Sequence, residues 1–160
     1  MSHFQPLYPG VVIDRAYAEY LNNADLSTAL PVDDTKPQNT EGTQVLSVSL
    51  SPKSTTNRVR VRVTLFGSLT TGPANLGAGL FLNSGADAVR AAAATVTVGN
   101  YLQVITMEYE HVPGSTSSQT YAVRVGAHTS AGPARLNGYP AGRYFGGVAG
   151  ATIEVEEIAA

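Results

Sequence analysis

The sequence lacks cysteine, long apolar runs and a leader-like start, and each absence excludes a class of protein. Because there is no cysteine, disulfides, thiolate chemistry and cysteine-ligated metals are excluded. No apolar run approaches the roughly 20 residues of a membrane helix, so we expect no membrane insertion. The opening stretch MSHFQPLYPGVV has no basic segment followed by an apolar core, which predicts no secretory signal and folding in the cytoplasm.

Charge is also scarce. Charged residues make up 14% of the 160-residue chain, and its net charge is −2, whereas soluble domains are usually about 25% charged. No cluster of Lys and Arg stands out beyond one RVRVRV run, which argues against nucleic-acid binding. Low charge with ample apolar content indicates that other subunits cover part of the surface. The alternative is a β surface rich in Gly, Ser and Thr that is polar without charge.

The clearest strand is the stretch RVRVRVTLF at residues 58–66, in which arginine or threonine alternates with valine or leucine. Period-2 alternation of β-branched residues is typical of a strand with one buried face. The preceding SPKSTTN at residues 51–57 has the proline and small hydroxyl residues of a turn. A long valine face needs a second sheet to cover it, and the rest of the chain can supply one.

Other segments carry strand patterns, with turn signals between them. Thr43–Leu50 alternates and is expected to form a hairpin with the arginine strand. Residues 101–109 (YLQVITMEY) are apolar on both faces, which is typical of a central strand covered by its own core and by a partner. Residues 86–98 allow a helix through their alanines or a strand through their TVTV ending. The remaining short or extended segments are 11–21, 26–32, 76–82, 120–125, 143–148 and 152–158.

Together these segments predict an all-β fold of roughly eight to ten strands. Spacings of about ten residues with turns between them indicate a sandwich or barrel. Asn137-Gly138 is the strongest two-residue hairpin signal in the chain. At this length one domain is expected: residues 15–160 would form it, and residues 1–14, with their prolines, would be an attachment segment.

Four runs resemble segments of phage fibre and spike domains: LPVDDTKPQNTEG (30–42), SVSLSPKSTTNRVRVRV (47–63), PGSTSSQTYAVRVG (113–126) and LNG…GRYFGG…IEVEEI (136–158). Their order and spacing are similar to those of tail-fibre, head-fibre or head-spike proteins of tailed phages and phage-like gene-transfer particles, over residues 15–160. The resemblance implies a jelly-roll sandwich of the tumour-necrosis-factor or C1q kind that forms homotrimers. Many fibres have a long N-terminal shaft, whereas only about 15 residues precede the match here.

The resemblance also implies a function. It predicts a particle-surface protein, made in the bacterial cytoplasm, that binds host polysaccharide such as capsule or lipopolysaccharide during adsorption. Residues 1–14 would bind a particle base, capsid or tail protein. The family has no catalytic motif, so we expect no enzyme activity and no cofactor. The alternative is a structural decoration or connector protein without a receptor, and a polysaccharide-degrading enzyme is a third hypothesis.

The arginine strand has two interpretations. Arg58, Arg60 and Arg62 share one face, and guanidinium groups suit the carboxylates or phosphates of an anionic glycan. Alternatively, they pair across the sheet with acidic residues. Glu154 and Glu156 share one face of the last strand and could lie opposite.

Two acidic groups could support other chemistry. Glu108 and Glu110 project to one side of their strand, and two close carboxylates are the minimum for glycoside hydrolysis. No cleft signal accompanies them. Asp33, Asp34 and Glu41 lie in one loop and could bind calcium, but the loop lacks the spacing of a recognised calcium motif, and loop capping is the alternative.

The three histidines, His3, His111 and His128, are far apart in sequence. In a trimer a single histidine could become a three-ligand metal site on the axis. Nothing else in the sequence supports such a site, and we expect no bound metal.

The candidate glycan-binding residues are Tyr139, Arg143 and Tyr144, around the Asn137-Gly138 turn. An aromatic ring can cover the C–H face of a sugar, while a guanidinium takes hydroxyls or acids. The alternative is that Tyr144, with Phe145 beside it, packs into the core or a subunit interface. Tyr139, next to a proline, is expected to be the better exposed of the two tyrosines.

Overall fold

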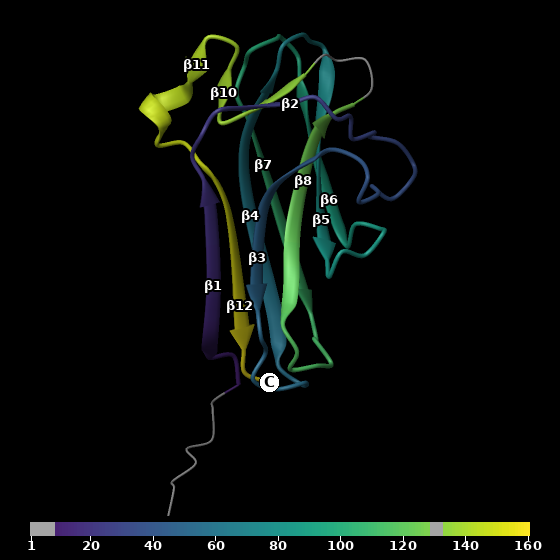
Figure 1. The fold of residues 1–160 in the computed structure, drawn as a ribbon, viewed down its shortest axis with the longest axis vertical. Coiled ribbons are helices and arrows are strands. Elements are labelled where there is room, and N and C mark those ends of the chain that lie inside the picture. The colour runs from purple at the N-terminus through teal and green to yellow at the C-terminus, as the bar shows by residue number, and fades with distance from the viewer. Residues whose placement is uncertain (1–8, 129–132) are drawn as a thin grey trace, which may run out of the picture.

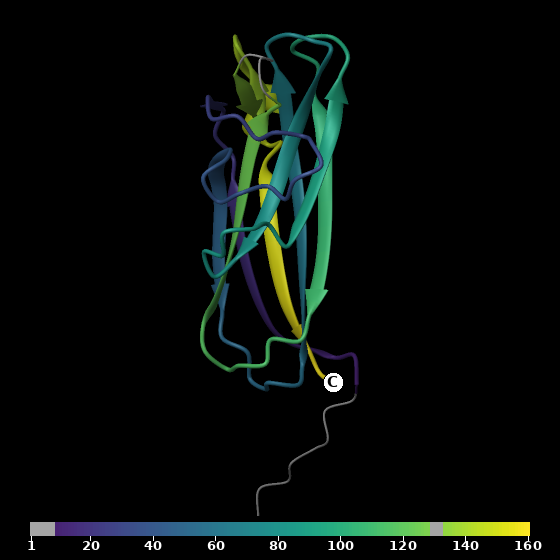
Figure 2. The same cartoon turned by 90° about the vertical axis from the view of Figure 1, so that its right-hand side faces the viewer.

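The computed structural model describes residues 9–128 and 133–160. Two antiparallel sheets face each other, and their strands run along the long axis of the molecule (Figures 1 and 2). The strands are β1 (Val12–Tyr20), β2 (Ala24–Leu26), β3 (Thr43–Leu50), β4 (Arg58–Leu69), β5 (Ala74–Leu82), β6 (Arg90–Val96), β7 (Gln103–His111), β8 (Gln119–Ala127), β9 (Ala134–Leu136), β10 (Gly138–Tyr139), β11 (Gly142–Arg143) and β12 (Ala151–Ile158).

The connectivity is that of a jelly roll. One sheet has the order β1-β12-β4-β9-β2, with β7 on the other side of β4, and the second has the order β3-β8-β5-β6. β4 holds the first sheet together because β12 and β9 pair with successive parts of one edge, while β7 pairs with the other. The predicted all-β jelly-roll sandwich is therefore confirmed.

The core lies between the two sheets and follows the predicted alternation. On β4, Val59, Val61 and Val63 are buried against the facing sheet, which contributes Leu80 and Val123 among others. The intervening arginines point to the outer face. Burying a valine or leucine contributes about 1.5–3 kcal/mol, so the valine side of β4 is a main source of stability.

The ambiguous segment 86–98 contains a strand. β6 (Arg90–Val96) pairs with β5 along its whole length. The alanines favour a helix, but pairing within the sheet outweighs that propensity and makes the segment a strand. The turn from residue 83 to 89 is fastened by the Gln38 side chain, which donates a hydrogen bond to Asp87. The loop of residues 33–42 therefore packs beside the start of β6.

The expected hairpin between β3 and the arginine strand is wrong. β3 pairs with β8 in one sheet, whereas β4 pairs with β12 and β7 in the other. Residues 51–57 thus cross from sheet to sheet. Alternation shows which side of a strand is buried, and two facing sheets satisfy that pattern as well as one hairpin does.

The expectation of a central strand at 101–109 is also wrong. β7 is an edge strand whose inward side chains Ile105 and Met107 are buried. On the outward face, Val104 is 53% exposed and is followed by Thr106 and two glutamates. That face is uncovered in the single chain.

Asn137-Gly138 is not a hairpin turn. Asn137 takes the left-handed conformation that the dipeptide favours, with φ of 57°, but it joins β9 to β10. The hairpin is between β10 and β11, and Pro140 and Ala141 form its turn. The predicted element at 143–148 is largely a 3-10 turn, η1 (Tyr144–Gly147).

A buried carboxylate fastens the sheet-crossing segment. Glu157 on β12 is 0% exposed, and its oxygens accept bonds from the backbone N–H of Lys53 (2.7 and 2.8 Å) and of Ser54 (3.1 Å). The side-chain amide of Asn57 donates a further bond of 2.6 Å to the same carboxylate. The polar segment 51–57 is thus held against the last strand.

The two ends of the molecule differ. The start of β1 and the C-terminus lie together at one end, and the β10–β11 hairpin with η1 lies at the other (Figure 1). Of the predicted attachment segment 1–14, residues 1–8 lie outside the described residues, and residues 12–14 begin β1. None of the helical segments described has the length and apolarity to cross a membrane.

Candidate functional site

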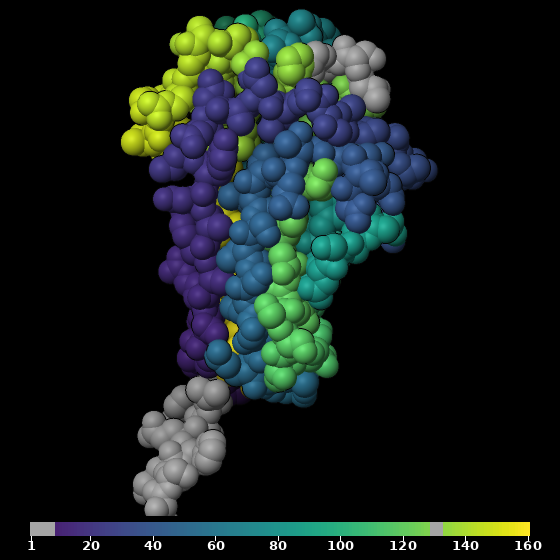
Figure 3. Space-filling model, viewed as in Figure 1, coloured from purple at the N-terminus to yellow at the C-terminus, as the bar shows by residue number. Residues whose placement is uncertain are grey.

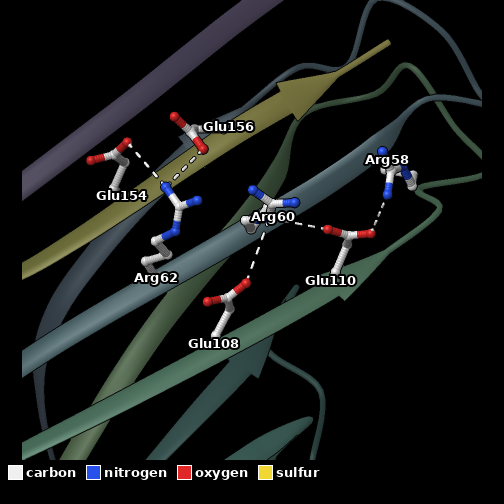
Figure 4. A network of polar contacts seen from close by, with 7 residues as sticks. All are labelled: Arg58, Arg60, Arg62, Glu108, Glu110, Glu154 and Glu156. Carbon is white, nitrogen blue, oxygen red and sulfur yellow. Dashed lines mark hydrogen bonds and ion pairs between the residues drawn. The ribbon is translucent and has the colours of Figure 1, made fainter. Parts of the chain in front are cut away.

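The arginine face of β4 meets acidic residues of β7. Arg58 contacts Glu110 at 2.9 Å, and Arg60 contacts Glu110 at 3.1 Å and Glu108 at 3.6 Å (Figure 4). Partial desolvation opposes the charge on Glu110, but the hydrogen bonds and charges of Arg60 and Arg58 outweigh it and lower the pKa of this carboxyl. The two glutamates considered for glycoside hydrolysis are therefore ion-pair partners on a regular strand.

β12 supplies carboxylates to the other side of the same row. Arg62 lies 3.0 Å from Glu156 and 4.0 Å from Glu154, which also contacts Arg15 of β1 at 3.2 Å. Figure 4 shows the arginines of β4 between the glutamates of the two neighbouring strands. Cross-strand pairing, the alternative interpretation of this face, is what the structure shows, and an anionic glycan would have to displace carboxylates already bound.

The acidic loop is capped by its own backbone. Asp33 accepts hydrogen bonds from the N–H (2.8 Å) and the hydroxyl (2.6 Å) of Thr35, and these bonds lower the pKa of Asp33. Glu41 accepts a bond of 2.8 Å from the N–H of Gln38. Over residues 9–128 and 133–160, no group of three or more acidic or histidine side chains is placed to hold a metal ion.

The two described histidines have structural partners. His111 lies 2.9 Å from the hydroxyl of buried Tyr121, and burial lowers the pKa of His111. The Nδ1 atom of His128 accepts a bond of 2.9 Å from the N–H of Val32. His3 lies outside the described residues.

The predicted glycan-binding residues lie together at the end of the molecule opposite the C-terminus. Tyr139 is on β10, Arg143 ends β11 and Tyr144 begins η1. This region protrudes from the body (Figure 3, upper left). Asn137 anchors it, because its buried side-chain amide donates to the carbonyls of Tyr20 (2.6 Å) and Asn22 (3.2 Å) at the end of β1.

Three aromatic rings pack against one another on β10 and η1. The rings of Tyr139 and Tyr144 are 5.1 Å apart between centroids, and those of Tyr144 and Phe145 are 6.4 Å apart. The hydroxyl of Tyr144 donates a hydrogen bond to the carbonyl of Asn100, and burial raises the pKa of this hydroxyl, as does neighbouring Tyr139. Tyr139 and Tyr144 are both half-buried, so the expected difference in exposure between the two tyrosines does not separate them into an exposed and a buried residue.

Phe145 and Tyr101 are the residues that sequence reasoning missed. Phe145 is 73% exposed and Tyr101 is 64% exposed. They line an open hollow of about 420 Å³ together with Gly99, Asn100, Leu102 and Tyr144. The two halves of this hollow are more than 40 residues apart in the chain, and no local pattern indicates that they meet.

The backbone of η1 is built to expose Phe145. Its φ of 50° lies in the left-handed region, which is unfavourable for a bulky residue. A second apolar side chain, Val148, is 83% exposed on the same turn. Sites where strain and exposed apolar surface coincide are often functional.

The sequence matches no family model, and no curated protein is similar to it. The fibre and spike resemblance therefore remains a prediction.

Among solved structures, the Eiger TNF of S. frugiperda is 13% identical, with a TM-score of 0.55, over 95% of this chain and 94% of its own. Lower similarity is found to the CBM22-1 xylan-binding domain of Paenibacillus barcinonensis Xyn10C (TM-score 0.39, 15% identity, 95% and 97% covered). The C-terminal domain of the sugar-binding protein EclA gives a TM-score of 0.36, with 13% identity and 84% and 80% covered. At 13% identity the Eiger TNF structure shows a shared fold alone, and the chain has a TNF-like jelly-roll fold.

Proposed function

We propose that this protein is a fibre or spike component of a phage or phage-like particle and binds a bacterial surface glycan through the aromatic site. That site consists of Tyr101, Tyr139, Arg143, Tyr144 and Phe145. The observation that carries the proposal is its place in the fold, at the far end of the long axis from the start of β1 and the C-terminus. A particle protein anchored near its first residues would present this end outward.

The chemistry of the site suits sugar. Exposed ring faces at Tyr101 and Phe145 can cover the C–H face of a pyranose, and the open hollow between them leaves room for a polymer to pass. The side chain of Asn100 and the guanidinium of Arg143 add hydrogen-bonding groups nearby. Surface recognition without a deep cavity gives weak affinity for each copy.

Multivalency would compensate for that weakness. We propose a homotrimer, in which three sites engage one surface together and weak single-site binding becomes avidity. The uncovered outer face of edge strand β7, including exposed Val104, is the surface we assign to contact with sister copies. Light scattering at micromolar concentration tests this assignment, and a monomer would contradict it.

Residues 1–14 are proposed to attach the protein to a base, capsid or tail protein of the particle. Residues 9–14 lie at the end away from the aromatic site, which leaves that site free when the segment is bound. Particle location follows from this proposal and is tested by detecting the protein on purified particles.

A cell-adsorption assay with labelled protein tests glycan binding. Tyr101→Ala and Phe145→Ala should each reduce adsorption about fivefold or more, if a sugar stacked on one ring is worth about the 1–3 kcal/mol of a stacked nucleic-acid base. Val112→Ala, which removes a 58% exposed apolar side chain from the loop after β7, is the matched control and should adsorb normally. If the wild-type protein does not adsorb, and particles that lack it adsorb normally, glycan binding is wrong and the decoration or connector function is the one that stays.

That second function has one observation in its favour. Phe145 and Val148 form exposed apolar surface that could contact a neighbouring particle protein instead of a sugar. Incubation with isolated capsule separates a third possibility, because a degrading enzyme would shorten the polymer and a binding protein would not.

A further inference from the structure

We infer that the aromatic site selects sugars that carry a carboxylate, such as uronic acids, and that Arg143 is the residue that distinguishes them from neutral sugars. This inference rests on the proposed glycan-binding function and adds the substrate class. Three observations support it: the free guanidinium of Arg143, the way that guanidinium is held, and the absence of acidic residues from the segments that build the site.

Arg143 has a free guanidinium. The arginines of β1, β4 and β9 are paired with carboxylates. Arg124 donates to the carbonyls of Glu41 (2.7 Å) and Gly42 (2.9 Å). Within residues 9–128 and 133–160, Arg143 makes no ion pair and its guanidinium donates no hydrogen bond, and the same is true of Arg90. An exposed arginine without a partner can accept an external carboxylate without losing an internal ion pair.

The guanidinium is held beside the aromatic rings. A Cβ atom added at Gly147 would lie 2.6 Å from Nη1 and 2.8 Å from Cζ of Arg143, so the cationic group rests on the backbone of η1. Gly147 is two residues from Phe145, which limits the separation of their Cα atoms to about 7.6 Å. A sugar stacked on Phe145 would thus hold its carboxylate near the guanidinium of Arg143, whose paired N–H groups can donate to both carboxylate oxygens.

The segments that build the site contain no acid. No Asp or Glu lies between Asp87 and Glu108, or between Glu110 and Glu154, and every residue of the aromatic site comes from one of these two stretches. Asp25, which β2 brings next to β9, is paired with Arg135. None of the segments that supply the side chains of the site therefore carries a carboxylate that could neutralise Arg143.

Binding to polygalacturonic acid and to its carboxyl-reduced neutral counterpart tests the inference, within a glycan array that contains further acidic and carboxyl-reduced pairs. Wild-type protein should prefer the acidic member of a bound pair by about tenfold or more, the value expected for one charge-assisted contact. Arg143→Gln should bring the ratio of acidic to neutral binding to about one, whatever affinity it keeps for the neutral member. Arg90→Gln removes the same charge from an unpaired arginine elsewhere and should preserve the preference.

The outcomes separate the inference from the function on which it rests. Equal binding to acidic and neutral members by the wild type, or a preference that survives Arg143→Gln, would overturn the inference alone. Absence of binding to every glycan would overturn both proposals. Two results together would support both proposals: Phe145→Ala loses binding to the acidic and the neutral glycan alike, and Arg143→Gln loses only the preference between them.

Discussion

Removing the Glu157 carboxylate tests most directly how the two sheets are fastened together. Glu157→Ala leaves the N–H groups of Lys53 and Ser54 and the amide of Asn57 without their common acceptor. The site is fully buried, so the small cavity left by alanine gives water little access to these donors. Segment 51–57 would then lose its attachment to β12.

The magnitude follows from the number of donors. A buried donor left without a partner costs about 1–3 kcal/mol. Because the three donors share one acceptor and relax together, the free energy of unfolding should fall by about 3–5 kcal/mol. In a domain of this size 1 kcal/mol corresponds to about 2–4 °C in Tm, so Tm should fall by about 6–20 °C. Glu157→Gln keeps one acceptor oxygen and should lose less.

Urea unfolding followed by circular dichroism measures the change. Glu108→Ala is the control, because its side chain is 62% exposed and its ion pair with Arg60 is long at 3.6 Å, and loss of an exposed pair costs about 0–1 kcal/mol. If Glu157→Ala unfolds within 1 kcal/mol of the wild type at an unchanged slope, the buried carboxylate is not holding the crossing segment and the reasoning fails.

Three further predictions concern pH, backbone strain and the hairpin. Burial lowers the pKa of His111, so the unfolded chain binds more protons near pH 6, and the free energy of unfolding should fall as pH drops below about 6.5. The urea midpoints at pH 7.5 and pH 5.5 should differ less in His111→Phe than in the wild type. An equal difference would show that His111 is not the source of the pH dependence. Phe145→Gly relieves a left-handed φ and should raise the free energy of unfolding by about 0.5–1 kcal/mol while weakening adsorption; unchanged adsorption would remove Phe145 from the site. Gly138→Ala would place Cβ 2.5 Å from the carbonyl oxygen of Gly142 and should lower the free energy of unfolding by about 1–3 kcal/mol in chemical denaturation. Gly114→Ala has open space around it and should cost only the roughly 1 kcal/mol that alanine loses at its left-handed φ of 65°.

The sequence predicted which faces of the strands are buried, but it did not predict all of their partners. Alternation along β4 correctly placed Val61 inside and Arg60 outside, and the matching alternation of β12 predicted that Glu156 could lie opposite the arginines. The second row of acids, Glu108 and Glu110, was not recognised as a partner because β7 was expected to be central. Period-2 patterns encode the side of a strand, whereas order within a sheet depends on contacts between distant segments.

The candidate site was also predicted only in part, because some of its residues are neighbours in the chain and others are not. Tyr139, Arg143 and Tyr144 could be grouped because they are neighbours in the chain around one turn. Tyr101 could not be added, because only the folded sandwich brings the loop before β7 beside η1. The exposure of Phe145 depends on a left-handed backbone conformation that sequence patterns do not indicate for phenylalanine.

The antiparallel pairing of β1 with β12 has a mechanical consequence. Tyr20 pairs with Ala151 and Val12 with Ile158, so the ladder extends from beside η1 to the opposite end of the molecule. Tension between an anchored β1 start and a ligand held at η1 would pull these two strands in opposite directions along their length. Their hydrogen bonds lie across that direction and would be loaded in shear, all at once, instead of opening one after another as in peeling.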